Sequence, residues 1–350
     1  MEGAKGSDKP RSPDPIYVLR SIKSPVTDLN IALLSNMQVI FCGRFDGQIE
    51  LWNLESKRVM SSIDGHGCSS VNAIGYLYAE YFYSHGRDGK VNVWNLCGGG
   101  IDKVSSFASE LTNFCKASTF SDACDLTSGF ILDNLNIIKS CCNEIKNWIA
   151  LPGPDSEITI KNIWNGENVH KLNISNDGGL GMCMYSKCIV NEHYGRPYIM
   201  AGYECGDIIL WDVAERKPLC QNKCFNEPVT CLDLTSTYAH GLVGSVERAI
   251  TTVEINNMET LDVKRSAITI KNSGLNDIKI RPDNKLVATA GWDGRIRLFS
   301  MKSLKALAVL TYHTESISKL AFSYNNAIGS KQLLVAGSRD GRISLWSIYN

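Results

Sequence analysis

The clearest pattern along the chain is a short stretch in which apolar and polar residues alternate directly after an Asp-Gly pair. Alternation with a period of two is typical of a β-strand that buries one face. An Asp-Gly pair between two strands favours a tight hairpin turn, because glycine readily adopts positive φ. The stretch recurs with the apolar pairs Ile49/Leu51, Val91/Val93, Ile296/Leu298 and Ile343/Leu345. The pattern therefore predicts several hairpins, each of which needs neighbours to cover its apolar face.

These hairpins belong to a longer repeat, which runs from a glycine through the turn to a large apolar residue. Five copies are clear, at Gly43–Trp52, Gly86–Trp94, Gly202–Trp211, Gly291–Phe299 and Gly337–Trp346. Two weaker copies, at Gly153–Trp164 and Gly244–Ile255, bring the number to seven. Their first glycines are 43, 67, 49, 42, 47 and 46 residues apart, close to the ~40–45 residues of a four-stranded propeller blade. We therefore predict an all-β fold, a seven-bladed β-propeller.

The two ends of the chain and the long interval between the second and third repeats allow further predictions. An insertion is expected within about residues 97–147, part of which supplies the outer strand of one blade and part the next blade. Trp346 lies on the third strand of its blade, and too few residues follow it to build a fourth. The apolar segment Ile16–Leu19 can supply that strand and close the ring, which removes an exposed strand edge. Residues 1–14 are predicted to be a disordered tail, and residues 15–350 form the propeller.

Composition narrows the classes of function. The 36 Lys and Arg residues balance 36 Asp and Glu, so the chain lacks the positive field that a general nucleic-acid binder uses. No apolar run approaches the ~20 residues of a membrane span, so we expect no membrane insertion. The 13 cysteines include no Cys-x-x-Cys pair. We therefore expect reduced cysteines, used as small core residues, in a cytoplasmic and/or nuclear protein.

No motif for catalysis, a metal or a cofactor is present. The 6 histidines are too far apart for a zinc site. The glycine-rich segment Cys97–Lys103 lacks the spacing and the Ser or Thr of a phosphate-binding loop. The turn aspartates are spread evenly, and we identify no His or acidic set directed at the axis of the ring. The sequence therefore predicts a protein that is not an enzyme and that binds no cofactor.

The residue before each turn aspartate is expected at the rim of the upper face, which we define as the face carrying these turns. The candidates for binding a partner there are Arg44, Phe45, Arg87, Trp292 and Arg339. Tryptophan and arginine are enriched at the residues that dominate protein interfaces, so the group predicts an interaction surface. The alternative is that Trp292 packs on its neighbouring loop and that the arginines pair with surface carboxylates.

A polar set in the second repeat resembles the WD-repeat family. His66, Ser84, Asp88 and Trp94 stand at the positions where WD-repeats join a loop, a strand and a turn by a line of hydrogen bonds. The resemblance covers the chain from about Pro15 to its end. It implies a WD40 β-propeller, in which these four residues have a structural role.

Other repeats keep only part of this set. The seventh has His313, Asp340 and Trp346, but Ala336 occupies the serine position, and the sixth has Phe299 in place of tryptophan. Each missing partner removes a hydrogen bond worth about 0.5–1.5 kcal/mol net. We therefore expect the incomplete blades to depend more on apolar packing.

Several stretches resemble one branch of this family. They are Ser84–Asp88, Gly181–Met184, Ala201–Tyr203, Ile280–Lys285, Ala288–Arg297, Leu307–Leu310 and Ala336–Tyr349. They are similar to the guanine nucleotide-binding protein subunit beta-like protein 1 family, which includes the fungal ASTRA-associated protein 1. The resemblance implies a non-catalytic scaffold, a monomer within a larger complex. Its implied partners are Tel2, Tti1 and Tti2-like co-chaperone subunits and the phosphatidylinositol-3-kinase-related kinases (PIKKs) that they stabilise.

Two other adaptor roles are alternatives for a WD-repeat propeller. Propellers that act as substrate receptors of cullin ubiquitin ligases often carry Trp-Asp-x-Arg, but the nearest string here is Trp211–Ala214, with arginine delayed to Arg216. A Gβ-like signalling adaptor needs an N-terminal helix, and Pro10, Pro13 and Pro15 oppose one. Both remain alternatives to the co-chaperone role.

Overall fold

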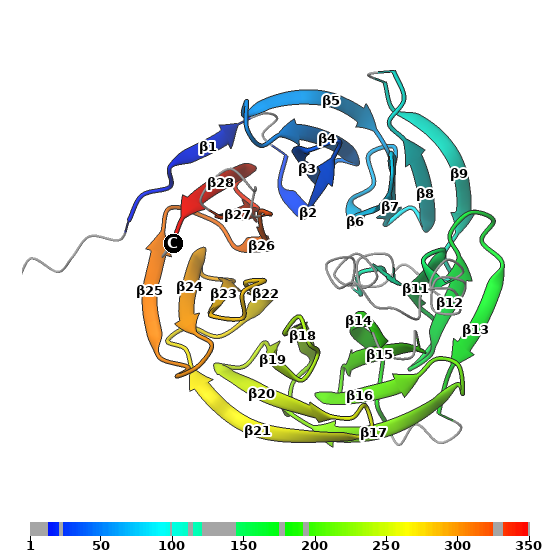
Figure 1. The fold of residues 1–350 in the computed structure, drawn as a ribbon, viewed down its shortest axis with the longest axis vertical. Helices are drawn as coiled ribbons and strands as arrows, with labels where there is room; N and C mark the ends of the chain where they lie inside the picture. The colour runs from blue at the N-terminus through cyan, green and yellow to red at the C-terminus, as the bar shows by residue number, and fades with distance from the viewer. Residues whose placement is uncertain are drawn as a thin grey trace, which may run out of the picture.

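The computed structural model describes residues 13–20, 24–98, 100–110, 115–120, 145–174, 179–191, 196–324 and 332–348. Within these ranges the chain forms seven four-stranded sheets, in which all paired strands are antiparallel. Figure 1 shows the sheets as blades arranged in a ring around a central axis. The predicted seven-bladed β-propeller is therefore confirmed. No helix in the described ranges is long and apolar enough to span a membrane.

In each of blades 1 to 6 the strands run in sequence order from the axis to the circumference. Blades 1 and 2 contain β2 (Val26–Leu34), β3 (Met37–Arg44), β4 (Gln48–Asn53), β5 (Arg58–Asp64), β6 (Val71–Tyr78), β7 (Tyr81–Gly86), β8 (Lys90–Asn95) and β9 (Asp102–Ala108). Blades 3 and 4 contain β10 (Ser118–Thr119), β11 (Trp148–Pro152), β12 (Ile158–Asn162), β13 (Asn168–Leu172), β14 (Cys183–Asn191), β15 (Arg196–Tyr203), β16 (Asp207–Asp212) and β17 (Lys217–Lys223).

The remaining blades follow the same order until the ring closes. Blades 5 and 6 contain β18 (Val229–Leu234), β19 (His240–Ser245), β20 (Ala249–Asn256), β21 (Thr260–Thr269), β22 (Leu275–Ile280), β23 (Leu286–Gly291), β24 (Arg295–Ser300) and β25 (Ala306–Thr311). Blade 7 contains β26 (Ile317–Phe322), β27 (Leu333–Ser338), β28 (Arg342–Ser347) and, as its outer strand, β1 (Tyr17–Arg20).

The closing strand lies where the sequence predicted it, within one residue. β1 pairs antiparallel with β28, placing Leu19 opposite Ile343, and the Ile16 N–H donates to the Leu345 carbonyl at 2.8 Å. Leu19 is only 1% exposed and packs among apolar residues of blades 1 and 7. The first strand of the chain therefore holds the last blade in the ring.

The structure also shows which strands the two weak repeats and the insertion form. The weak repeats form blades 3 and 5, and both are complete four-stranded sheets. The predicted insertion supplies β9, the outer strand of blade 2, and β10, the inner strand of blade 3. Residues 99, 111–114 and 121–144 of the insertion, and residues 1–12 of the predicted tail, lie outside the described residues. The ten described cysteines are free, and six of them are buried.

Two local features aim side chains at the upper face. The first is the turn between the second and third strands, where Gly47 has a φ of 86° and donates its N–H to the Arg44 carbonyl. The second is a β-bulge near the start of the inner strand, present in blades 1, 2, 4, 5, 6 and 7. A bulge redirects the side chain of its extra residue. Six blades therefore present a redirected side chain at the mouth of the central channel.

Candidate functional site

The upper face opens into a cavity of about 690 Å³ on the axis of the ring. Four of the five predicted rim residues line it, each from a different blade: Phe45, Arg87, Trp292 and Arg339. All four are exposed. The turns predicted from the sequence thus surround one concave surface, although these residues are up to 294 positions apart in the chain.

Arg44, the fifth candidate, is not a rim residue, and this part of the prediction is wrong. Its side chain is fully buried, and its guanidinium donates to Glu50 Oε2 at 2.8 Å, to the Ser24 carbonyl at 2.7 Å and to the Gly341 carbonyl at 3.2 Å. Arg44 is the last residue of β3 and turns inward to Glu50, whereas Phe45, the first residue of the turn, is exposed. Arg44 joins blade 1 to blade 7.

Trp292 packs on a neighbouring loop, as the alternative proposed, and also keeps much of its ring exposed. Its ring lies against Gly274, where an added Cβ would come within 2.3 Å of the ring, and its Nε1–H donates to Asn276 Oδ1 at 2.7 Å. The ring nevertheless remains 47% exposed, and Phe45 is 53% exposed. Trp292 is therefore a fixed and exposed aromatic surface, held by Gly274 and Asn276 at the start of β22.

The bulge residues form the upper wall of the cavity. They are Thr27, Asn72, Met184, Thr230, Asn276 and Ser318. Thr27 Oγ1 donates to the Val71 carbonyl at 2.6 Å, and Asn276 Nδ2 donates to the Ile317 carbonyl at 2.7 Å. Both bonds reach the next blade, so the bulges serve the joints between blades as well as the wall.

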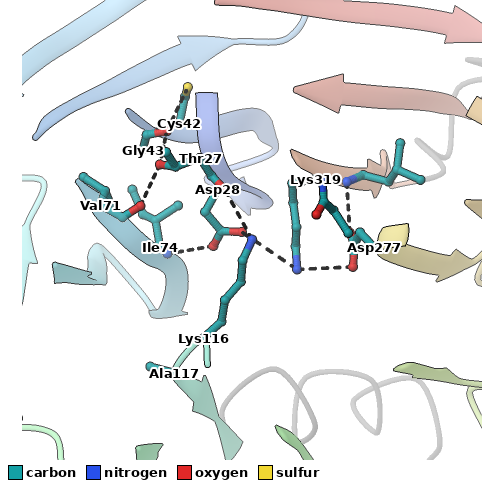
Figure 2. A network of polar contacts seen from close by, with 12 residues as sticks. Thr27, Asp28, Cys42, Gly43, Val71, Ile74, Lys116, Ala117, Asp277 and Lys319 are labelled. Carbon is teal, nitrogen blue, oxygen red and sulfur yellow. Dashed lines mark hydrogen bonds and ion pairs between the residues drawn. The ribbon is translucent and has the colours of Figure 1, made fainter. Parts of the chain in front are cut away.

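Lys116 and Tyr185 form the floor, because they line both this cavity and a second one of about 290 Å³ below it in the channel. The Lys116 ammonium donates to Asp28 Oδ1 at 2.7 Å and to the Thr27 carbonyl at 3.2 Å (Figure 2). Lys116 belongs to blade 3 and Asp28 to blade 1. Blade 2, between them, carries the small residue Ala73 at the position that corresponds to Asp28. The small side chain leaves room for the lysine to reach across.

The channel below holds charged side chains that the sequence analysis did not find. Asp28, Asp233 and Asp277 each accept a backbone N–H from the inner strand of the next blade, at 2.9, 2.7 and 3.0 Å. Lys319 Nζ lies 3.8 Å from Asp28 Oδ1 and 3.5 Å from Asp277 Oδ1, and Figure 2 shows these contacts, which link blades 1, 7 and 6. The expectation that no acidic set is directed at the axis was therefore wrong.

These charges are compensated. Burial would raise the pKa of Asp233, but Lys187, Lys279 and the Ile280 N–H together hold it below its ordinary value. Burial likewise opposes the charge of Lys319, yet Asp277 and Asp28 raise its pKa well above the ordinary value. Both groups therefore stay charged at neutral pH, and they link blades. In the described part of the chain, no three His, Cys, Asp or Glu side chains are grouped as a metal site requires.

The structural polar set of blade 2 is assembled as a line. Trp94 Nε1 donates to Ser84 Oγ at 2.8 Å, and His66 lies 2.8 Å from Ser84 Oγ and 2.9 Å from Asp88 Oδ1. Because the serine oxygen accepts the indole proton, its own proton goes to His66 Nε2, and His66 Nδ1–H donates to Asp88. The line therefore joins the third strand, the second strand, the loop and the turn.

Blade 7 completes the same line in a way that the sequence analysis missed. Ser344, directly across from Ala336 on the third strand, lies 2.7 Å from both His313 Nε2 and Trp346 Nε1, and His313 Nδ1 lies 2.9 Å from Asp340. The signal was a polar residue two positions before the tryptophan, which puts both side chains on one face of the strand.

Two further blades use that position for a charged residue. Glu50, two before Trp52, accepts the Trp52 indole N–H at 3.0 Å and pairs with Arg44. Arg297, two before Phe299, makes a bidentate contact with Asp293 at 2.6 and 3.1 Å. These blades therefore replace the missing partners with other polar contacts and do not rely on apolar packing alone.

Acid is expected to weaken the ring through His85. This side chain is fully buried, and burial lowers its pKa from 6.5 to about 4; burial also lowers the pKa of His66. Between pH 6.5 and pH 4, His85 binds a proton in the unfolded chain but not in the folded chain. The free energy of unfolding therefore falls as the pH falls through this range. At ~1.4 kcal/mol per pKa unit, the loss from His85 is on the order of 3 kcal/mol.

Urea denaturation at pH 7 and pH 4.5 measures this loss. The variant His85→Gln cannot titrate and should lose less stability between the two pH values than the unmodified chain. His240→Gln, at an exposed position, is the matched control and should behave as the unmodified chain. Equal losses in His85→Gln and the unmodified chain would contradict the assignment.

Comparison with known proteins agrees with this architecture. The family model described as "WD domain, G-beta repeat" matches residues 265–300 and 304–347. The Cps50 (Swd1) β-propeller domain of Myceliophteria thermophila superposes with a TM-score of 0.74 at 17% sequence identity, covering 95% of this chain and 100% of that domain. That similarity shows the fold alone.

Two relatives align with almost the whole chain, so they indicate its family and not the fold alone. ASTRA-associated protein 1 of Schizosaccharomyces pombe is 26% identical over 385 residues, covering 96% of this chain and 99% of the relative. Guanine nucleotide-binding protein subunit beta-like protein 1 of Mus musculus is 33% identical over 346 residues, covering 97% of this chain and 98% of the relative. Identity at this level over both full lengths shows that the chain belongs to the guanine nucleotide-binding protein subunit beta-like protein 1 family of WD-repeat propellers.

Proposed function

We propose that this WD-repeat adaptor assists the Tel2–Tti1–Tti2 co-chaperone pathway, which stabilises PIKK-family kinases. The observation that carries the proposal is the upper cavity, whose rim exposes Phe45, Arg87, Trp292 and Arg339 from four blades. Aromatic and arginine side chains around a concave surface are the usual anchors of a protein partner. The pathway itself is supported by the family resemblance and by the relatives named ASTRA-associated protein 1.

The rigidity of the ring suits this role. Blades are joined by Arg44 to the Gly341 carbonyl, by Asp28 to the Ile74 N–H and by Asp277 to the Leu320 N–H. A surface whose side chains are already fixed loses less conformational entropy when a partner binds. The adaptor therefore offers a preformed platform to large partners, in the cytoplasm or the nucleus.

Affinity purification of the tagged full chain tests the proposal. The unmodified chain should recover Tel2, Tti1 and Tti2-like subunits together with a PIKK-family kinase. The double variant Trp292→Ala/Arg339→Ala should recover about tenfold less, the change expected for 1.4 kcal/mol of lost binding energy. Arg248→Ala is the matched control, because Arg248 is exposed in the corresponding turn of blade 5 but does not line the cavity.

Depletion of the protein provides the second readout. PIKK-family protein levels should fall while their messenger RNA levels stay constant, because a co-chaperone adaptor acts after translation. Unchanged kinase levels would overturn the pathway assignment. Recovery of a cullin adaptor or of a Gγ-like subunit in place of the co-chaperone subunits would favour one of the alternative adaptor roles.

A further inference from the structure

The upper cavity is more positively charged than the protein as a whole. The full chain is formally neutral, with 36 basic and 36 acidic residues. Among the described residues that line the cavity, the charged ones are Arg87, Lys116, Arg339 and the acid Glu315. Lys116 is paired with Asp28, so the excess positive charge comes from the two arginines against one glutamate, and field lines concentrate in such a cavity.

The cationic groups occupy two depths. Arg87 and Arg339 are exposed at the rim, whereas Lys116 lies at the floor, with 25% of its side chain exposed. The Lys116 ammonium has three N–H donors, of which Asp28 and the Thr27 carbonyl accept two. The third can be donated to an acceptor that enters the cavity from above. An anionic group can thus meet cations at both depths.

The rim also offers apolar contact between the cations. Trp292 is held by Asn276 and exposes 47% of its surface, and Phe45 exposes 53%. An occupant that uses the whole cavity therefore combines carboxylates with an aromatic or large aliphatic side chain. A nucleic acid strand is disfavoured, because the chain carries no net positive charge outside the cavity to follow a phosphate backbone.

We infer that the upper cavity binds an acidic peptide segment of a protein partner, with a carboxylate directed at Lys116, further carboxylates at Arg87 and Arg339, and an apolar side chain against Trp292 and Phe45. This inference rests on the proposed function only in requiring that a protein partner occupies the cavity. The inference predicts that removing a positive charge and removing a negative charge at the rim change the affinity for the peptide in opposite directions. Removing a rim cation weakens binding, and removing Glu315 strengthens it.

A phage-displayed library of random peptides, selected on the full chain, provides the probe. The enriched peptides should be rich in Asp and Glu and carry at least one aromatic or large aliphatic residue. Synthetic copies should bind Arg339→Glu and Arg87→Glu at least about tenfold more weakly, as expected for the loss of a charge-assisted contact. Glu315→Gln should bind them more tightly, and Arg248→Glu, outside the cavity, should bind them as the unmodified chain does.

Several outcomes would overturn the inference. They are enrichment of basic or neutral peptides, no enrichment above background, equal binding to the rim variants, and displacement of the peptides by a single-stranded oligonucleotide. All four substitutions lie at exposed positions, and melting curves matching that of the unmodified chain show that each variant is folded. Acidic peptides that bind the cavity while depletion leaves kinase levels unchanged would refute only the pathway assignment. Falling kinase levels without cavity binding would refute only this inference.

Discussion

Replacing Arg44 with methionine is expected to lower the free energy of unfolding by about 3–5 kcal/mol, among the largest effects of any single substitution in this chain. The side chain is fully buried and is paired with Glu50, which is 1% exposed. Removing the guanidinium leaves the Glu50 carboxylate buried without its counter-ion. It also removes the donors to the Ser24 and Gly341 carbonyls, so the joint between blades 1 and 7 is weakened.

Urea denaturation of three variants separates these contributions. Arg44→Met/Glu50→Gln should regain much of the loss, because a neutral amide keeps an acceptor for the Trp52 indole without leaving a buried charge. Arg58→Met, at an exposed arginine in β5, is the matched control and should change stability by less than about 0.5 kcal/mol. A loss in Arg44→Met no larger than in this control would show that the buried pair does not support the ring.

Leu19→Ala is expected to destabilise the ring by about 2–5 kcal/mol, the usual cost of truncating a buried leucine. The side chain is 1% exposed and packs with Ile343 and Leu345 of β28 and Val26 of β2. Because β1 has only four residues, loss of its main apolar contact should free the outer edge of blade 7. An exposed strand edge promotes association with other chains.

Denaturation and amide hydrogen exchange test the closure together. In Leu19→Ala, the amides of β28 should exchange faster than those of β24, the corresponding strand of blade 6, and light scattering should detect association. Val18→Ala, on the opposite and half-buried face of β1, is the control and should cost less than about 1 kcal/mol. Unaltered exchange in β28 would mean that the ring does not depend on this strand.

Much of the architecture was predictable because it is encoded in short, repeated stretches. Three features of the sequence predicted it: the alternation after each turn, the spacing of the glycines, and the lack of a fourth strand after Trp346. Each depends on residues within one blade or on the pairing of the first strand with the last. The same local logic identified Phe45, Arg87, Trp292 and Arg339 as rim positions, because the residue that enters the turn is exposed in each of these four blades. It left open whether the weak third and fifth repeats form complete four-stranded sheets, which the structure shows.

The errors arose where side chains of different strands or blades meet. Arg44 was assigned to the rim from its neighbour, but the third strand carries Glu50, and the buried pair decides the direction of the arginine. The serine missing at Ala336 is supplied by Ser344 from the strand opposite. Asp28 and Lys116 stand 88 positions apart and meet past the inner strand of blade 2, which carries the small residue Ala73 at that level.

The amino-acid sequence alone therefore determined the number of blades, the closing strand and the turns, because strand periodicity and turn chemistry depend on residues that are near one another in the chain. Only the tertiary structure decided which charges enter the central channel, which polar partners replace the missing ones, and that the rim residues surround a single cationic cavity. Those features depend on distances between blades, which are set when apolar faces pack around the axis and are not written in any one repeat.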